Sequence, residues 1–111
     1  MTMTAAVHVE HEDGLCFVRL TGEIDILVAR DLEQLGEAMI ETTTASEVII
    51  DMADVTFLDS TAIGALIAMR RAARARRLPL RIDHAPPRVR RILAIIGIDD
   101  LFDVGSDDAR Y

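Results

Sequence analysis

The sequence of 111 residues has no lysine and no tryptophan, a single cysteine, and only 4 % aromatic residues. The lone Cys16 excludes an internal disulfide and a cysteine-based metal site, so we expect a buried thiol in a reducing compartment. No segment reaches the ~20 consecutive apolar residues that a membrane-spanning helix needs, and the first residues lack the pattern of a signal peptide. We therefore expect a cytoplasmic protein without a membrane span.

Half of the residues are nevertheless hydrophobic, which is enough for a core built from aliphatic side chains. The length is typical of one domain, and no repeat, linker or low-complexity segment divides it. The sequence thus predicts a single domain over residues 1–111, and we expect it to be a monomer.

Acidic residues outnumber basic residues, and the formal net charge is −7. This balance argues against nucleic acid as a direct partner, because DNA binding relies on neutralising phosphates. Nine of the twelve basic residues lie between Arg70 and Arg91, where Asp83 is the only acid. The Arg70–Arg91 stretch is most simply a solvated surface, and docking of an acidic protein partner is the alternative. No aromatic stacking residues or recognition-helix pattern accompany the stretch, which disfavours DNA binding there.

The first half of the chain predicts a hairpin followed by a helix. Residues 7–11 alternate in polarity, Asp13-Gly14 is a strong two-residue turn signal, and residues 15–20 form the second strand. The stretch TGEID at residues 21–25 is expected to break that strand, and its Asp25 to cap a helix over residues 26–41. The inward face of this helix is predicted from apolar residues at helical spacing, which are Val28, Leu32, Leu35 and Met39.

The second half alternates strands and helices. EVIID at residues 47–51 predicts a short buried strand, followed by a connection that is partly extended. A helix is expected from Ser60 to Arg76, and its inward stripe consists of Ala62, Leu66, Met69 and Ala73.

After that helix, residues 78–83 predict another short strand. Pro86 and Pro87 open a third helix, because proline is tolerated in a first turn, and Gly97 ends it. The predicted inward face of this helix consists of Val89, Ile92, Leu93 and Ile96. Residues 98–104 close the domain with a brief strand.

This order of elements, β-β-α-β-α-β-α, predicts an α/β fold. Strand–helix–strand units imply right-handed crossovers and parallel pairing, whereas the opening hairpin adds an antiparallel pair. We therefore expect a mixed β-sheet with an N-terminal hairpin and β-α-β-α-β-α units, whose helices pack on the sheet.

The stretch FLDSTAIGAL at residues 57–66 places a carboxylate and two hydroxyls where a buried strand gives way to a helix. Capping is one interpretation, in which Asp59 or Ser60 accepts from free backbone N–H groups. A serine nucleophile is another, but it would need a nearby base, and the stretch is not the G-x-S-x-G elbow. A phosphate site is the third interpretation. The absence of lysine and of a glycine-rich loop excludes a P-loop, whereas a covalently attached phosphate remains compatible with the helix start.

Two other carboxylates, those of Glu23 and Asp25, lie near the end of the second strand. General acid–base catalysis would require a pocket and a substrate handle, and nothing in the sequence supplies either. Turn formation and helix capping explain Asp25 better.

Three stretches of the chain carry a familiar pattern. They are LTGEIDILVARDLEQ at residues 20–34, VIIDMADVTFLDSTAIGALIAMRRAAR at residues 48–74, and VRRILAIIGIDDLF at residues 89–102. Together they resemble the STAS domain family, and most closely its stand-alone anti-sigma factor antagonists. The stretches cover well over half of the chain in the family's order, and the central one is the most specific.

The resemblance assigns roles to residues around the second helix. Ser60 matches the family's phosphorylated serine, and Ala62 stands where many members have glycine. The resemblance therefore implies phosphorylation at Ser60 and partner binding by the surrounding residues Asp25, Asp59, Thr61, Ala62 and Gly64.

The resemblance also implies a partner switch in bacterial transcription regulation, without catalysis by this chain. The unmodified antagonist binds an anti-sigma factor that is also a serine kinase, and so frees a sigma factor. Phosphorylation of Ser60 releases the antagonist, and a serine phosphatase resets it. No cofactor is expected for the chain, because ATP and Mg²⁺ belong to the kinase. The alternative is a structural or scaffold STAS subunit of a stress-signalling or lipid-transport complex.

Overall fold

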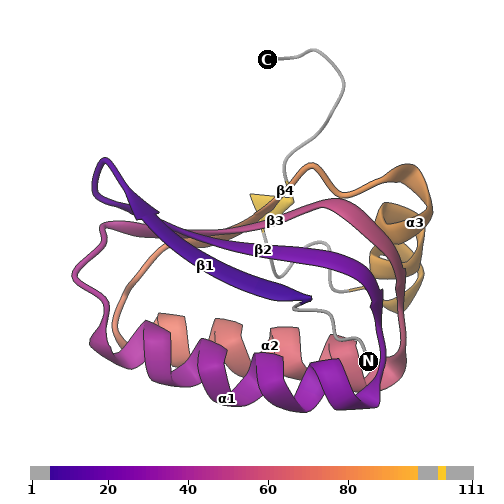
Figure 1. The fold of residues 1–111 in the computed structure, drawn as a ribbon, viewed down its shortest axis with the longest axis horizontal. Helices are drawn as coiled ribbons and strands as arrows, with labels where there is room; N and C mark the ends of the chain where they lie inside the picture. The colour runs from indigo at the N-terminus through magenta and orange to yellow at the C-terminus, as the bar shows by residue number, and fades with distance from the viewer. Residues whose placement is uncertain (1–5, 98–102, 105–111) are drawn as a thin grey trace.

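A computed structural model describes residues 6–97 and 103–104, in which a β-sheet carries two long helices on one face (Figure 1). The elements in chain order are β1 (Val7–Glu12), β2 (Leu15–Ile24), α1 (Ile26–Thr42), β3 (Glu47–Leu58), α2 (Ser60–Ala75), β4 (Leu80–Asp83), α3 (Pro87–Ile96) and β5 (Asp103–Val104). The strands lie in the order β1-β2-β3-β4-β5, with β1 antiparallel to β2 and all other neighbours parallel. The predicted α/β fold with a mixed sheet is confirmed.

The N-terminal hairpin forms as the sequence predicts. Asp13 and Gly14 have φ angles of 53° and 79°, and a two-residue hairpin turn of type I′ requires positive φ at both positions. The turn fixes the register, so that Glu12 pairs with Leu15 and Val9 with Val18.

Both central strands extend further than the sequence analysis predicts. The expected break at residues 21–25 is wrong, because β2 continues to Ile24, and the expected connection after residue 51 is strand as far as Leu58. Gly22 takes a φ of 80°, and the register between β2 and β3 shifts on both sides of it. The glycine is therefore accommodated as an irregularity within a continuous strand pair.

The core lies between the sheet and the layer formed by α1 and α2. The sheet contributes alternate residues of β2 and β3, which are Cys16, Val18, Leu20, Val48, Ile50 and Met52, all at most 1 % exposed. The predicted inward stripe of α2 is confirmed, since each of its four residues is buried. Burial of Cys16 is confirmed as well, and that burial raises the pKa of its thiol.

The inward faces of the other two helices differ partly from the prediction. In α1 the buried residues are Ala29, Leu32, Gly36 and Ile40, whereas Leu35 is 53 % exposed. The buried face is turned because α1 packs against α2 as well as against the sheet, and Gly36 lies directly over Met69. In α3 the residues Val89 and Leu93 are buried, whereas Ile96 is 50 % exposed.

The ends of the helices are fixed by backbone and side-chain caps. The Arg76 guanidinium donates to the carbonyl oxygens of Ile40 and Thr43 at the end of α1, the latter at 3.1 Å. Gly97 ends α3 with a φ of 85°, as predicted.

The brief last strand predicted within residues 98–104 is present as β5, whereas residues 98–102 lie outside the described part. Within the described part, no helix has the length and apolar character to cross a membrane.

Candidate functional site

The starts of α1 and α2 lie side by side at one edge of the sheet (Figure 1). The parallel strands β2 and β3 end together there, with Ile24 paired to Leu58, and each leads directly into its helix. The Asp59 N–H also donates to the Ile24 carbonyl oxygen at 3.4 Å. The strand register thus brings two helix N-termini, with their free N–H groups, to the same place.

Each of these helices is capped by an aspartate. Asp25 Oδ1 accepts from the N–H groups of Leu27 at 3.1 Å and Val28 at 3.2 Å, which confirms the predicted cap of α1. Asp59 Oδ1 accepts from the Ala62 N–H at 2.9 Å. Of the two candidates for the second cap, Asp59 is therefore the cap, and Ser60 is the first residue of α2.

The two hydroxyls beside Asp59 are in different situations. The Thr61 hydroxyl donates to Asp59 Oδ1. This hydrogen bond is the largest cause that holds the pKa of the Asp59 carboxyl below its ordinary value, and the bond from the Ala62 N–H is the second. Ser60 is exposed, and its hydroxyl has no hydrogen-bond partner within the described residues. The Ser60 hydroxyl is consequently available at the surface, whereas that of Thr61 is engaged.

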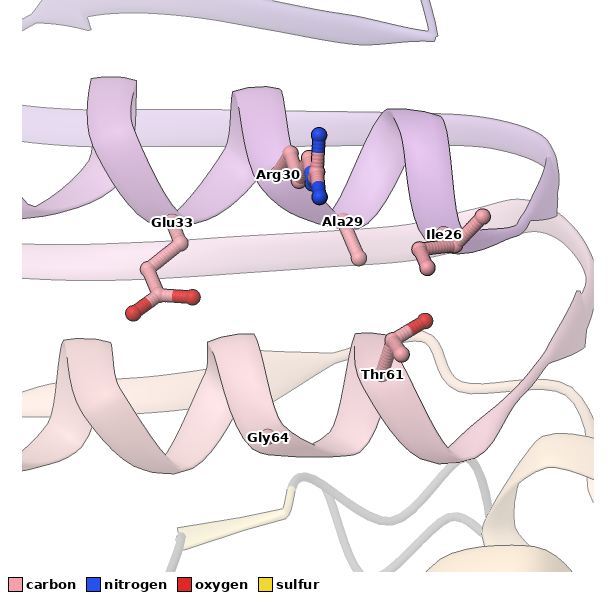
Figure 2. Close-up of a pocket in the computed structure, with 6 residues that line it drawn as sticks. All are labelled: Ile26, Ala29, Arg30, Glu33, Thr61 and Gly64. Carbon is pink, nitrogen blue, oxygen red and sulfur yellow. The ribbon is translucent and has the colours of Figure 1, made fainter.

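A cleft of about 330 Å³ lies between the first turns of α1 and α2. We call it the α1–α2 groove, and it is lined by Ile26, Ala29, Arg30, Glu33, Thr61 and Gly64 (Figure 2). Figure 2 shows the Glu33 side chain directed across the gap towards α2, and Thr61 and Gly64 on the opposite wall. The groove therefore begins at the residue next to Ser60.

Gly64 and Ala62 differ in their access to a partner. Gly64 is exposed, and a Cβ added there would meet nothing within 4 Å, so the groove wall is open at this point. The Ala62 side chain is 0 % exposed and belongs to the core. The first turn of α2 directs the Ala62 side chain inward, and partner binding at Ala62 stays a prediction. Its N–H serves instead as the donor to Asp59.

Four residues of the groove wall were not among the predicted site residues, namely Ile26, Ala29, Arg30 and Glu33. Helical periodicity places Arg30 and Glu33 on the exposed, polar side of α1, and the part of that side next to α2 forms the groove wall. The available signal was their position within two turns of Asp25, on a helix that starts at the same sheet edge as α2.

The nucleophile interpretation of Ser60 receives no support from the described contacts. The histidines have other neighbours: His8 pairs with Glu10, His11 with Thr43, and His84 with Asp51. The described residues also contain no group of three or more His, Cys, Asp or Glu side chains arranged to hold a metal ion. Asp25 is engaged as a cap, and Glu23 is exposed on β2.

The Arg70–Arg91 stretch does not form one surface, because its residues lie on different elements. Arg76 binds the carbonyl end of α1, and Arg81 of β4 forms ion pairs with Glu47 and Asp83. The remaining arginines are divided between α2 with its following turn and α3, which lies apart from α2 beside the end of β3 (Figure 1). Two arginines of the stretch are thus engaged within the fold, and the others are divided between two helices.

Comparison with known proteins gives consistent matches over nearly the whole chain. The family model described as "Mlab, STAS domain" matches residues 7–103. An anti-sigma-B factor antagonist of Staphylococcus aureus is 24 % identical over 104 residues, covering 94 % of this chain and 95 % of that protein. A STAS-domain containing protein of Pseudomonas aeruginosa is 28 % identical over 87 residues, covering 78 % and 84 %. The crystal structure of an anti-sigma factor antagonist from Mycobacterium paratuberculosis superposes with a TM-score of 0.81 at 27 % identity, covering 94 % and 87 %.

Proposed function

The chain belongs to the STAS domain family, and from this premise we propose that it is an anti-sigma factor antagonist controlled by phosphorylation of Ser60. The unmodified chain binds an anti-sigma factor that is also a serine kinase, and a sigma factor is thereby freed. Phosphorylation of Ser60 by that kinase ends the complex, and a serine phosphatase restores the binding form. The supporting observation is the exposed Ser60 hydroxyl, which has no partner within the described residues, beside a Thr61 hydroxyl held by Asp59.

The position of Ser60 suits a switch that acts on binding and leaves the fold intact. A phosphate at the first residue of α2 meets the positive end of the helix dipole, which tolerates an anion. The same phosphate adds about −1.5 to −2 charges to a surface that already carries Asp25 and Asp59. Like charges brought together in an interface cost several kcal/mol. Because ~1.4 kcal/mol is a factor of ten, such a cost is enough to release a partner.

The proposed contact surface surrounds Ser60 and consists of Asp25, Asp59, Thr61 and Gly64. Gly64 supports this assignment, because glycine inside a helix costs about 1 kcal/mol relative to alanine and no neighbour occupies the space of a Cβ. A closely approaching partner backbone is a reason for glycine there. The chain acts as one domain and as a monomer in this proposal, in the cytoplasm where sigma factors meet RNA polymerase, and ATP and Mg²⁺ remain with the kinase.

The proposal is tested with the purified chain, its kinase-type anti-sigma factors and ATP. We expect a mass increase of one phosphate, located at Ser60 and not at Thr61. Ser60→Ala should bind the anti-sigma factor like the unmodified chain and resist phosphorylation. Ser60→Asp should keep its melting temperature and bind at least tenfold more weakly in calorimetry, since one added charge meets Asp59. Equal affinities of Ser60→Asp and the unmodified chain, with no phosphate at Ser60, would contradict the switch.

A second candidate function is a structural STAS subunit of a larger complex, such as one for lipid transport or stress signalling. The observation that favours it is the description "Mlab, STAS domain" of the family model that matches the chain. In that case no anti-sigma factor binds, and the surface around Ser60 contacts another subunit of the complex permanently. Binding of a purified anti-sigma factor that is lost on phosphorylation separates the two candidates.

A further inference from the structure

Two oppositely charged side chains of α1 line the α1–α2 groove without forming an ion pair. Arg30 and Glu33 are both exposed, lie one turn apart, and have no ion pair or hydrogen bond within the described residues. Opposite charges three residues apart on a helix are neighbours and commonly attract each other. Here Figure 2 shows Glu33 directed towards α2, and Arg30 further along α1 towards Ile26. Both charges therefore remain available to another molecule.

The remaining features of the groove favour contact with a protein. Ile26 is 51 % exposed at the end nearest the helix caps, and Gly64 leaves the opposite wall open. An exposed apolar side chain beside unpaired charges suits a specific interface, in which the apolar contact supplies affinity and the charges supply selectivity. The groove also begins at Thr61, so an element that covers Ser60 reaches it without a gap in the contact.

The charges along this face alternate in sign. Asp25 at the cap is negative, Arg30 is positive, and Glu33 is negative, and Arg30 is the only cation among the residues that line the groove. A partner that fits this order presents an acidic side chain to Arg30 and a basic one to Glu33. A partner with the reverse order meets like charges at both positions, and such contacts are strongly unfavourable.

We propose that Arg30 and Glu33 select which anti-sigma factor this chain binds, by pairing with an acidic and a basic side chain of that partner. This inference rests on the proposed function, because the occupant of the groove is the anti-sigma factor that covers Ser60. Ser60 decides when the complex exists, and the charge order on α1 decides with which anti-sigma factor it forms.

The test exchanges the two charges in one variant, Arg30→Glu/Glu33→Arg. The exchange preserves net charge and the i, i+3 spacing, so we expect an unchanged melting temperature. The probes are the purified kinase-type anti-sigma factors of the source organism, each titrated by calorimetry. We expect at least tenfold weaker binding to the anti-sigma factor that the unmodified chain prefers, and a changed order of preference among the others.

A matched control makes the same exchange far from the groove. Glu12 lies at the hairpin tip and Arg74 in the last turn of α2, and both are exposed. The hairpin tip and the end of α2 lie on the side of the molecule opposite the helix starts (Figure 1). Glu12→Arg/Arg74→Glu should bind like the unmodified chain. An equal loss in this control would assign the effect to long-range charge and overturn the role of the groove.

Rescue on the partner provides the decisive measurement. The surface charges of the anti-sigma factor are first reversed one at a time, to find the acidic and the basic residue that contact the groove. Reversing both of these residues together should then raise the affinity for the exchanged variant at least tenfold. Ser60→Asp is measured in parallel to separate two failures. If Ser60→Asp binds weakly but the exchange has no effect, the selectivity role is wrong and the switch remains. If no anti-sigma factor binds the unmodified chain, the proposed function itself is wrong.

Discussion

The two ends of the α1–α2 layer are built from the same pair of helices but differ in what they leave unpaired. At the N-terminal end, the Ser60 hydroxyl, Arg30 and Glu33 are exposed without partners in the described part, and Gly64 has open space beside it. In the C-terminal half, Gly36 lies against Met69, and the guanidinium of Arg76 binds the last carbonyls of α1.

This difference separates the part of the layer that maintains the fold from the part that is free to bind. Tight packing and satisfied carbonyls in the C-terminal half fix the distance and orientation of the helices. The N-terminal ends then need few contacts of their own, so their surface can meet a partner. The open end is also the edge where the parallel strands β2 and β3 finish, which is the usual place for binding sites in α/β proteins.

The largest expected effect within this comparison comes from Gly36→Ala in the closed half. A Cβ at residue 36 would lie 2.7 Å from Met69 Sδ, and Met69 is fully buried and cannot move into solvent. Overpacking of this kind costs about 1–3 kcal/mol, of which alanine's helix propensity offsets up to about 1 kcal/mol. With the full offset, we expect the free energy of unfolding in urea to fall by up to about 2 kcal/mol. An unchanged value would mean that the Met69 side chain or the helices shift here at little cost.

A smaller loss is expected from Arg76→Ala, which removes the side-chain donors to Ile40 and Thr43. Because water can reach part of this site, the free energy of unfolding should fall by about 1 kcal/mol, close to the net contribution of one hydrogen bond. Amide hydrogen exchange should quicken in the last turn of α1 and remain unchanged at the Asp25 cap. Equal effects at both ends of α1 would show that the two ends are not independent.

Gly64→Ala at the open end should instead raise the free energy of unfolding by about 0.5–1 kcal/mol, because alanine has a higher helix propensity than glycine. The new Cβ has no atom within 4 Å to clash with in the isolated chain. If the proposed partner approaches closely, the same variant should bind it more weakly while melting at a higher temperature. A loss of stability would instead indicate a structural need for glycine in the first turns of α2.

The smallest expected effect concerns the Asp59 cap and pH. The hydrogen bond from Thr61, and after it the one from the Ala62 N–H, lowers the pKa of Asp59 in the folded chain. Its ionised form therefore stabilises the fold above the ordinary pKa of 3.8, and this contribution is lost as the pH falls through and below that value. Asp59→Asn keeps a side-chain cap but lacks the charge, so its deficit in unfolding free energy should be smaller at about pH 3 than at pH 7. If the deficit in unfolding free energy does not change with pH, the cap stabilises the fold through its hydrogen-bond geometry and not through its charge.

Local signals in the sequence were sufficient for the hairpin, the helices, the cap of α1 and the end of α3. The Asp13-Gly14 turn, the Asp25 cap and the Gly97 stop each depend on a few adjacent residues, and all three appear as predicted. The lengths of β2 and β3 were not predictable in the same way. A glycine at residue 22 signals a break locally, and only pairing with β3 shows that the strand continues.

The candidate site was likewise predictable from the sequence only in part. The sequence by itself determined the Asp59–Ser60–Thr61 junction, because a carboxylate and two hydroxyls between an apolar strand and a helical stripe are a local pattern. The tertiary structure alone decided that Asp59 is the cap, that Ala62 is buried, and that Arg30 and Glu33 face the start of α2. The physical reason is that the cap depends on the residue at which the twelve-residue strand β3 ends, whereas the other facts depend on how the two helices lie against the sheet and against each other. No pattern within either helix encodes these arrangements.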